Sequence, residues 1–234
     1  MNLLILSLAP VVIIAAYIYF RDKYEKEPVR LLIFALLAGA VSVIPILLVE
    51  SFLSTFSTLF PHYLAAAWKA FVVAAFSEEG FKYIALYLLI WKSPEFNEKF
   101  DGIVYATYVS LGFAAVENVL YVMEGGMSTG LSRALTAVPA HAIFGITMGF
   151  FFGLARFYPR QQKQLKMKAL FIPMLLHGIY DFILFTELAW LTIFFLGFVV
   201  YLYISGLKRM KNISNQSIYN TDFQLLNQKF SKPD

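Results

Sequence analysis

Long apolar stretches alternate with short polar segments along most of the chain. A helix needs about 20 consecutive, mainly apolar residues to cross a bilayer. Seven stretches meet that length, at 2–20, 31–50, 67–91, 102–123, 133–157, 168–186 and 188–207. The pattern therefore predicts an all-α fold, a polytopic membrane helix bundle of about seven transmembrane helices. We expect one transmembrane domain at 1–207 and a polar cytoplasmic tail at 208–234.

Basic residues gather in every second connection between these stretches. Four follow the first span, two follow the third, five follow the fifth and three open the tail. The connections after the second and sixth spans carry none, and the fourth connection carries Arg133 alone. Because basic loops stay on the cytoplasmic side, we expect the N-terminus outside and the C-terminus in the cytoplasm.

The composition narrows the class of protein and its partners. Of the 234 residues, 59% are hydrophobic and only 15% are charged, whereas about a quarter of a soluble domain is charged. The net charge of +4 comes from basic residues at span ends, which suit anionic lipid headgroups and not nucleic acid. With no cysteine in the chain, thiol nucleophiles and cysteine metal sites are excluded.

Two carboxylates and a lysine interrupt the third apolar stretch. Glu78 and Glu79 fall at its midpoint in the sequence AAFSEEGFKY, where a charge costs about 2.5–3.5 kcal/mol on insertion scales. Lys82 follows at i+4 and i+3, so a helix places all three on one side. They could form a structural clamp between helices, but ionisable groups inside a membrane more often mark a functional site.

Three further spans carry polar residues at a compatible depth. Glu117 lies in the fourth span, His141 in the fifth, and His177 and Asp181 one turn apart in the sixth. When the alternating directions of the spans are respected, every group falls between the midplane and the outer leaflet. Each alone could be a structural hydrogen-bond partner, but together they predict one polar site. Other charges at span ends are interpreted as side chains that reach water: Glu50, Lys69, Arg133 and Glu187.

Carboxylates and histidines without a serine or cysteine nucleophile favour chemistry by activated water. A poorly solvated glutamate is a competent general base, and a histidine can stabilise the oxyanion of an attacked amide. A zinc ion is the alternative, since two histidines and one or two glutamates could bind it. No HExxH spacing occurs, so the zinc interpretation depends on residue type alone.

Three motifs in this order resemble the PrsW family of bacterial intramembrane proteases. They are Glu78-Glu79-x-x-Lys82, Phe113-x-x-x-Glu117-Asn118 and His177-x-x-x-Asp181. More remotely, they are similar to the superfamily of type II CAAX prenyl endopeptidases and bacteriocin-immunity proteins. The resemblance extends over essentially all of 1–207.

The resemblance implies a multi-pass protein of the bacterial plasma membrane. It implies a protease that makes the first, extracytoplasmic-side cut in a single-span anti-sigma factor, and a downstream site-2 protease would act on the product in a stress response. By the same resemblance Glu78 activates water, Glu79 and Lys82 tune its charge, and His177 stabilises the oxyanion with Asp181 as its orienter. We expect no cofactor, with zinc as the alternative.

The chain departs from the wider superfamily at two positions. Glu117 stands where the second superfamily motif has histidine, so either His141 or Glu117 itself could complete the pair that activates water. Lys82 stands one position before the superfamily arginine. A proton- or ion-coupled transporter, a scaffold, and a CAAX-type or immunity peptidase remain alternatives. Transport is disfavoured because the inner halves of spans four to six are almost wholly apolar and the two halves show no inverted repeat.

Overall fold

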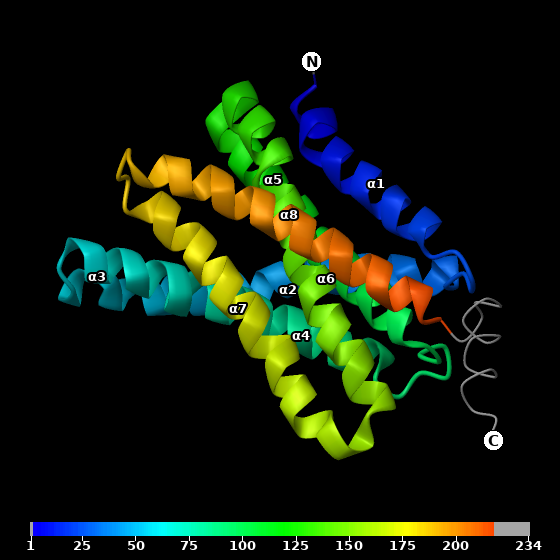
Figure 1. Ribbon diagram of the computed structural model, residues 1–234. Helices are drawn as coiled ribbons and strands as arrows, with labels where there is room; N and C mark the ends of the chain where they lie inside the picture. The colour runs from blue at the N-terminus through cyan, green and yellow to red at the C-terminus, as the bar shows by residue number, and fades with distance from the viewer. Residues whose placement is uncertain (1, 218–234) are drawn as a thin grey trace, which may run out of the picture.

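The computed structural model describes residues 2–217, and its regular elements there are all helices (Figure 1). The α-helices in residues 2–217 are α1 (Leu3–Arg21), α2 (Val29–Ser54), α3 (His62–Ala67), α4 (Ser77–Ile90), α5 (Lys99–Leu135), α6 (Ala137–Phe157), α7 (Gln162–Phe185) and α8 (Leu191–Asn215). Two short 3₁₀ helices, η1 (Thr55–Leu59) and η3 (Pro159–Gln161), lie in connections, and a π-helix, η2 (Trp68–Phe76), joins α3 to α4. The expected all-α bundle is confirmed.

Several helices are long and apolar enough to cross a membrane. Five such stretches occur among the described residues, at Leu3–Arg21, Val29–Leu59, Lys99–Phe157, Pro159–Phe185 and Ile193–Asn215. The third of them contains both α5 and α6 and therefore two of the expected spans. The expected span at 67–91 corresponds to η2 followed by α4, which carry Glu78, Glu79 and Lys82. The count of seven spans and the orientation stay predictions.

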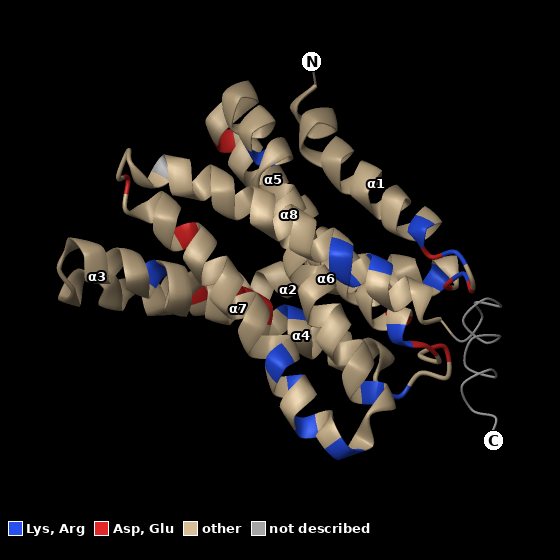
Figure 2. Ribbon diagram, viewed as in Figure 1, with Lys and Arg blue, Asp and Glu red and all other residues tan. Residues whose placement is uncertain are grey.

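The basic helix ends lie at one end of the bundle (Figure 2). Lys99, at the start of α5, donates to the hydroxyl of Tyr158 after α6 at 3.0 Å. Lys166 of α7 lies 3.6 Å from the ring centroid of Trp91, just after α4. The bundle therefore has a basic end, as expected for a cytoplasmic side, and an opposite end that includes the start of α1.

The helices α5 and α6 pack closely against each other. A Cβ atom on Gly149 of α6 would lie 2.2 Å from the carbonyl oxygen of Gly102 on α5. Small residues at such crossings let backbones approach closely inside a membrane. This contact fixes the register of α5 against α6 and thus the relative positions of Glu117 and His141.

A sharp turn divides α5 near its end. Gly126 has φ +73° and ψ −158°, a region that side chains other than glycine rarely adopt. After this turn, residues 127–135 run back along the helix, so that Gly130 packs against Leu6 and Val122. The sequence predicted a connection between spans at this point, and the structure shows a helical hairpin.

The last described helix runs past the expected boundary of the tail. The helix α8 continues through residue 208 to Asn215, and residues 218–234 lie outside the described part of the chain. The division into a transmembrane domain at 1–207 and a tail at 208–234 stays a prediction.

Candidate active site

The two adjacent glutamates begin α4 directly after the π-helix. The π-helix is a rare element that recurs at functional sites, and here it ends at Phe76, two residues before Glu78. The exposed fraction is 5% for Glu78 and 0% for Glu79 and Lys82. The ammonium of Lys82 donates at 2.9 Å to Oε2 of Glu78 and at 2.9 Å to Oε1 of Glu79. The predicted grouping on one side of the helix is confirmed.

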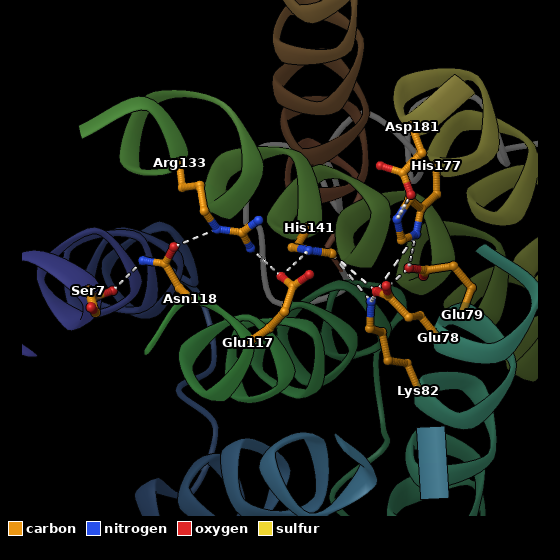
Figure 3. A network of polar contacts seen from close by, with 10 residues as sticks. All are labelled: Ser7, Glu78, Glu79, Lys82, Glu117, Asn118, Arg133, His141, His177 and Asp181. Atoms are coloured by element: carbon orange, nitrogen blue, oxygen red, sulfur yellow. Dashed lines mark hydrogen bonds and ion pairs between the residues drawn. The ribbon is translucent and has the colours of Figure 1, made fainter. Parts of the chain in front are cut away.

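His177 of α7 lies between two carboxylates. Its Nδ1 is 3.1 Å from Oε1 of Glu79, and its Nε2 is 3.2 Å from Oδ2 of Asp181 (Figure 3). Both nitrogens can donate at once only when the ring is an imidazolium. Asp181 therefore fixes the ring from one side while the glutamate pair holds it from the other.

His141 of α6 joins the glutamate pair to Glu117 of α5. Its Nε2 is 3.0 Å from Oε2 of Glu117, and its Nδ1 is 3.3 Å from the Lys82 ammonium. An ammonium only donates, so Nδ1 must accept this hydrogen bond and Nε2 carries the proton that is donated to Glu117. The neutral His141 ring therefore has a defined tautomer.

The structure adds a residue that the sequence interpretation placed in water. Arg133 donates from Nη2 to Oε2 of Glu117 and, at 2.9 Å, from Nε to Oδ1 of Asn118. The amide nitrogen of Asn118 donates in turn to the backbone oxygen of Ser7 on α1 at 2.8 Å. The span-end interpretation is wrong for Arg133, because the turn at Gly126 directs it back to the site. The Gly125-Gly126 pair was the available signal.

All the site residues expected from the sequence therefore belong to one continuous network (Figure 3). The expected set is Glu78, Glu79, Lys82, Glu117, His141, His177 and Asp181, and Arg133, Asn118 and Ser7 extend it to α1. Elements distant in sequence, namely α1, α4, α5, α6 and α7, supply its members.

A cavity of about 530 Å³ adjoins this network. Glu78 and His177 line it, as do Glu117, His141 and Asp181, whereas Glu79 and Lys82 lie behind its wall. The cavity extends to Ser54, Lys69 and Phe185. Ser54 and Phe185 are the last residues of α2 and α7, whose first residues belong to the basic end. The cavity therefore opens toward the end of the bundle opposite the basic one.

Comparison with known proteins identifies the family. The profile described as "PrsW family intramembrane metalloprotease" matches residues 27–205. This range covers more than half of the chain and contains every site residue except Ser7. The chain belongs to the PrsW family. It is a multi-pass bacterial membrane protein of a peptidase family, and the resemblance noted in the motifs is confirmed.

Curated PrsW relatives match along nearly their whole length. "Protease PrsW" of Geobacillus kaustophilus is 35% identical over 211 residues, which are 90% of this chain and 91% of the relative. "Protease PrsW" of Oceanobacillus iheyensis is 36% identical over 220 residues, 94% and 100% of the two chains. "Protease PrsW" of Bacillus subtilis is 35% identical over 206 residues, 88% and 92%. The search of solved structures gave no significant match.

The family description includes the term metalloprotease. The residues of this PrsW site are therefore compared with the requirements of a metal ion. Glu78, Glu79, His141 and His177 each offer a ligand atom, and these atoms lie within 4.8 Å of one another. Their types suit zinc. However, the Lys82 ammonium contacts three of the four side chains at 2.9, 2.9 and 3.3 Å. With Lys82 in this position the four side chains do not fit a metal ion.

Proposed function

We propose that this chain is an intramembrane endopeptidase that uses water activated by a glutamate. We propose further that it makes the first, extracytoplasmic-side cut in a single-span anti-sigma factor. The observation that carries the proposed chemistry is the asymmetry of the glutamate pair, since Glu78 lines the cavity and Glu79 does not. Glu78 is thus the carboxylate that can reach a water molecule and a peptide bond.

In the proposed reaction Glu78 takes a proton from a water molecule in the cavity. The water oxygen attacks the carbonyl carbon of the scissile peptide bond, and the carbonyl oxygen becomes an oxyanion. Glu78 then gives the proton to the leaving amine as the C–N bond breaks. Glu79, which binds Lys82 and His177, keeps these two cations beside Glu78.

His177 is the proposed donor to the oxyanion: its Nδ1–H, which faces Oε1 of Glu79 at 3.1 Å in the resting site, is shared with the oxyanion as that charge forms. Its ring lines the cavity beside Glu78, with Nδ1 3.9 Å from Oε2 of that residue. A preorganised donor in a water-poor site stabilises charge that develops in the transition state. Asp181, on the opposite ring nitrogen, holds the imidazole in place during that step.

His141 and Glu117 form the proposed second wall of the water site. His141 lines the cavity and is tied to Glu117 at 3.0 Å. The departure from the superfamily motif is thereby accommodated, because histidine and glutamate come together here from α6 and α5. In this proposal Glu117, which also lines the cavity, positions the water, and His141 and Arg133 hold Glu117 in place.

The direction in which the cavity opens supports an extracytoplasmic cut. It reaches the ends of α2 and α7 opposite the basic end, and basic ends face the cytoplasm. Between the site and the basic end lies an apolar cluster that includes Leu86, Ile103 and Phe152. This packing favours a site open on one side over a proton relay through the bundle. The anti-sigma substrate itself is proposed from the motif resemblance.

Cleavage by the purified protein in liposomes tests the proposal. The substrate is a tagged single-span anti-sigma factor, and the variants are Glu78→Gln and His177→Ala. We expect the wild type to cut on the extracytoplasmic side and both variants to lose at least about 100-fold of the rate. Glu95→Gln, at an exposed position near the basic end, is the matched control and should cut like the wild type.

Two results would contradict the proposed chemistry. Cleavage by Glu78→Gln at the wild-type rate would show that this carboxylate is not the base. Activity lost in a chelator and restored by zinc would require a metal in place of the proposed mechanism.

Other results bear on the substrate and on the class of protein. If the wild type does not cut the anti-sigma factor but cuts another membrane peptide, the proposed substrate is wrong and the proposed peptidase activity is retained. Glu78-dependent proton flux without cleavage would favour a transporter.

A further inference from the structure

The Lys82 ammonium lies among the groups that would otherwise bind a cation. An ammonium has three N–H donors and no acceptor. Here three acceptors surround it: Oε2 of Glu78 at 2.9 Å, Oε1 of Glu79 at 2.9 Å and Nδ1 of His141 at 3.3 Å. Every donor thus has a partner, and each partner comes from the set of potential metal ligands.

The same ligand atoms have nearly the spacing of a zinc site. The ligands of a tetrahedral zinc ion lie about 3.3 Å apart, given bond lengths of about 2.0–2.2 Å. Nδ1 of His177 is 3.1 Å from Oε1 of Glu79 and 3.9 Å from Oε2 of Glu78. Nδ1 of His141 is 4.0 Å from Oε2 of Glu78. A small contraction would bring the four atoms to zinc-binding distances if their centre were free.

Lys82 is held in this position by its surroundings. The residue is 0% exposed, and its ammonium lies 3.9 Å from the ring centroid of Phe113, the first residue of the second motif. An aromatic face attracts a cation most strongly where water is excluded. The ring of Phe113 also packs edge-on against His141, with centroids 5.4 Å apart. The ammonium is therefore enclosed by carboxylates, an imidazole and an aromatic face.

We propose that Lys82 is a built-in cation that takes the place of a metal ion in this site. The ammonium and a divalent ion would bind the same two carboxylate oxygens and repel each other, so they exclude one another. In the wild-type chain Lys82 neutralises the glutamate pair and keeps zinc out. Replacing Lys82 by a neutral side chain of similar length creates a zinc site from Glu78, Glu79, His141 and His177.

This inference deepens the proposed function and concerns the same site, but its test needs no substrate. Zinc binding is measured on the purified full-length protein in detergent, by titrating ZnCl₂ against a chromophoric chelator and by determining metal content after size exclusion. A failure of the anti-sigma factor as substrate therefore leaves the binding result unaffected. If Lys82→Met does not bind zinc, the inference about Lys82 is wrong, and the cleavage assay still tests the proposed function independently.

The central variant is Lys82→Met, which keeps the length of the side chain and removes its charge. We expect it to bind about one zinc ion per chain, and to lose that ion when combined with His177→Ala, which removes a ligand. The wild type and Lys82→Arg, which keeps the charge, should bind at least about 100-fold more weakly. Lys69→Met is the matched control, because Lys69 lines the outer part of the same cavity and should behave like the wild type.

Two outcomes would overturn the proposal. One is stoichiometric zinc in the wild type that is lost in His177→Ala, because zinc would then share the site with Lys82. The other is a monodisperse Lys82→Met protein that binds zinc no better than the wild type. The wild-type titration does not depend on whether any variant folds, so it tests the proposal even if Lys82→Met is unstable.

Discussion

The side chain of Arg133 donates from Nε to Oδ1 of Asn118 at 2.9 Å, although the two residues are fifteen positions apart on α5. A continuous helix would separate them by roughly 22 Å. The turn at Gly126 brings them together and places the guanidinium on Glu117 as well. The side chain of Arg133 thereby links the helical hairpin at the end of α5, residues 127–135, to the candidate active site.

Arg133→Gln should slow substrate cleavage by roughly 10- to 100-fold. A hydrogen bond to a charged group contributes about 1.5–3 kcal/mol, and its loss frees Glu117 and therefore His141. Because Arg133 positions groups without touching the reacting atoms in our proposal, the loss should be in kcat while KM changes little. Steady-state kinetics on the tagged substrate separate the two.

Two variants control that experiment. Arg133→Lys should recover only part of the rate, because one ammonium cannot reproduce the planar fork that serves Glu117 and Asn118 together. Arg160→Gln removes an exposed arginine at the basic end and should leave the kinetics unchanged. Full activity of Arg133→Gln would show that catalysis does not depend on this contact.

Gly126→Ala should destabilise the fold by about 1–3 kcal/mol. The position has open space around it, so the cost comes from its backbone angles and not from a clash. Gly197 of α8 also has open space but lies within a regular helix, and Gly197→Ala should be neutral or slightly stabilising. Thermal unfolding in one detergent compares them. Equal melting temperatures would argue against a strained turn at Gly126.

Asp181 is predicted to act through His177. Asp181→Asn keeps an oxygen that can accept from Nε2 but removes the charge, whereas Asp181→Ala removes the partner altogether. We expect a decrease in the cleavage rate of roughly tenfold for Asn and a larger decrease for Ala. Equal, severe losses in both would indicate that the negative charge, and not the orientation of the ring, is what His177 requires.

The connection between α1 and α2 should make stability depend on pH. The pKa of the Asp22 carboxyl is raised from 3.8 to about 6: burial is the largest cause and nearby Glu98 and Glu25 act in the same direction, while the Glu27 N–H and Lys26 oppose the rise. The folded chain therefore binds a proton that the unfolded chain releases near pH 4. Its stabilising effect is full below pH 4 and is lost as the pH rises through 6.

Thermal unfolding at pH 5 and pH 8 checks this dependence. The wild type should unfold at a lower temperature at pH 8, and Asp22→Asn should show a smaller difference, since asparagine cannot ionise. Burial also raises the pKa of Glu27, so part of the dependence should remain in Asp22→Asn. A wild-type melting temperature that rises between pH 5 and pH 8 would contradict the assignment.

The sequence by itself determined the class of the protein and the residues of the candidate site other than Arg133 and Ser7. Apolar stretches of spanning length can only be helices in a bilayer, and charges within them need partners, so Glu78, Glu79 and Lys82 could be grouped from helical spacing alone. The contact of His177 with Asp181 follows from the same i, i+4 rule. These are local relationships, and local geometry fixes them.

Only the tertiary structure decided which helices meet at the site. His141 reaches Glu117 because α5 and α6 cross closely at Gly102 and Gly149. Arg133 joins the site because a single glycine with positive φ reverses the chain. Such contacts depend on crossing distance and on turn geometry, which hydropathy does not encode. The position of the Lys82 ammonium among three potential metal ligands likewise depends on how α4 packs against α6 in three dimensions.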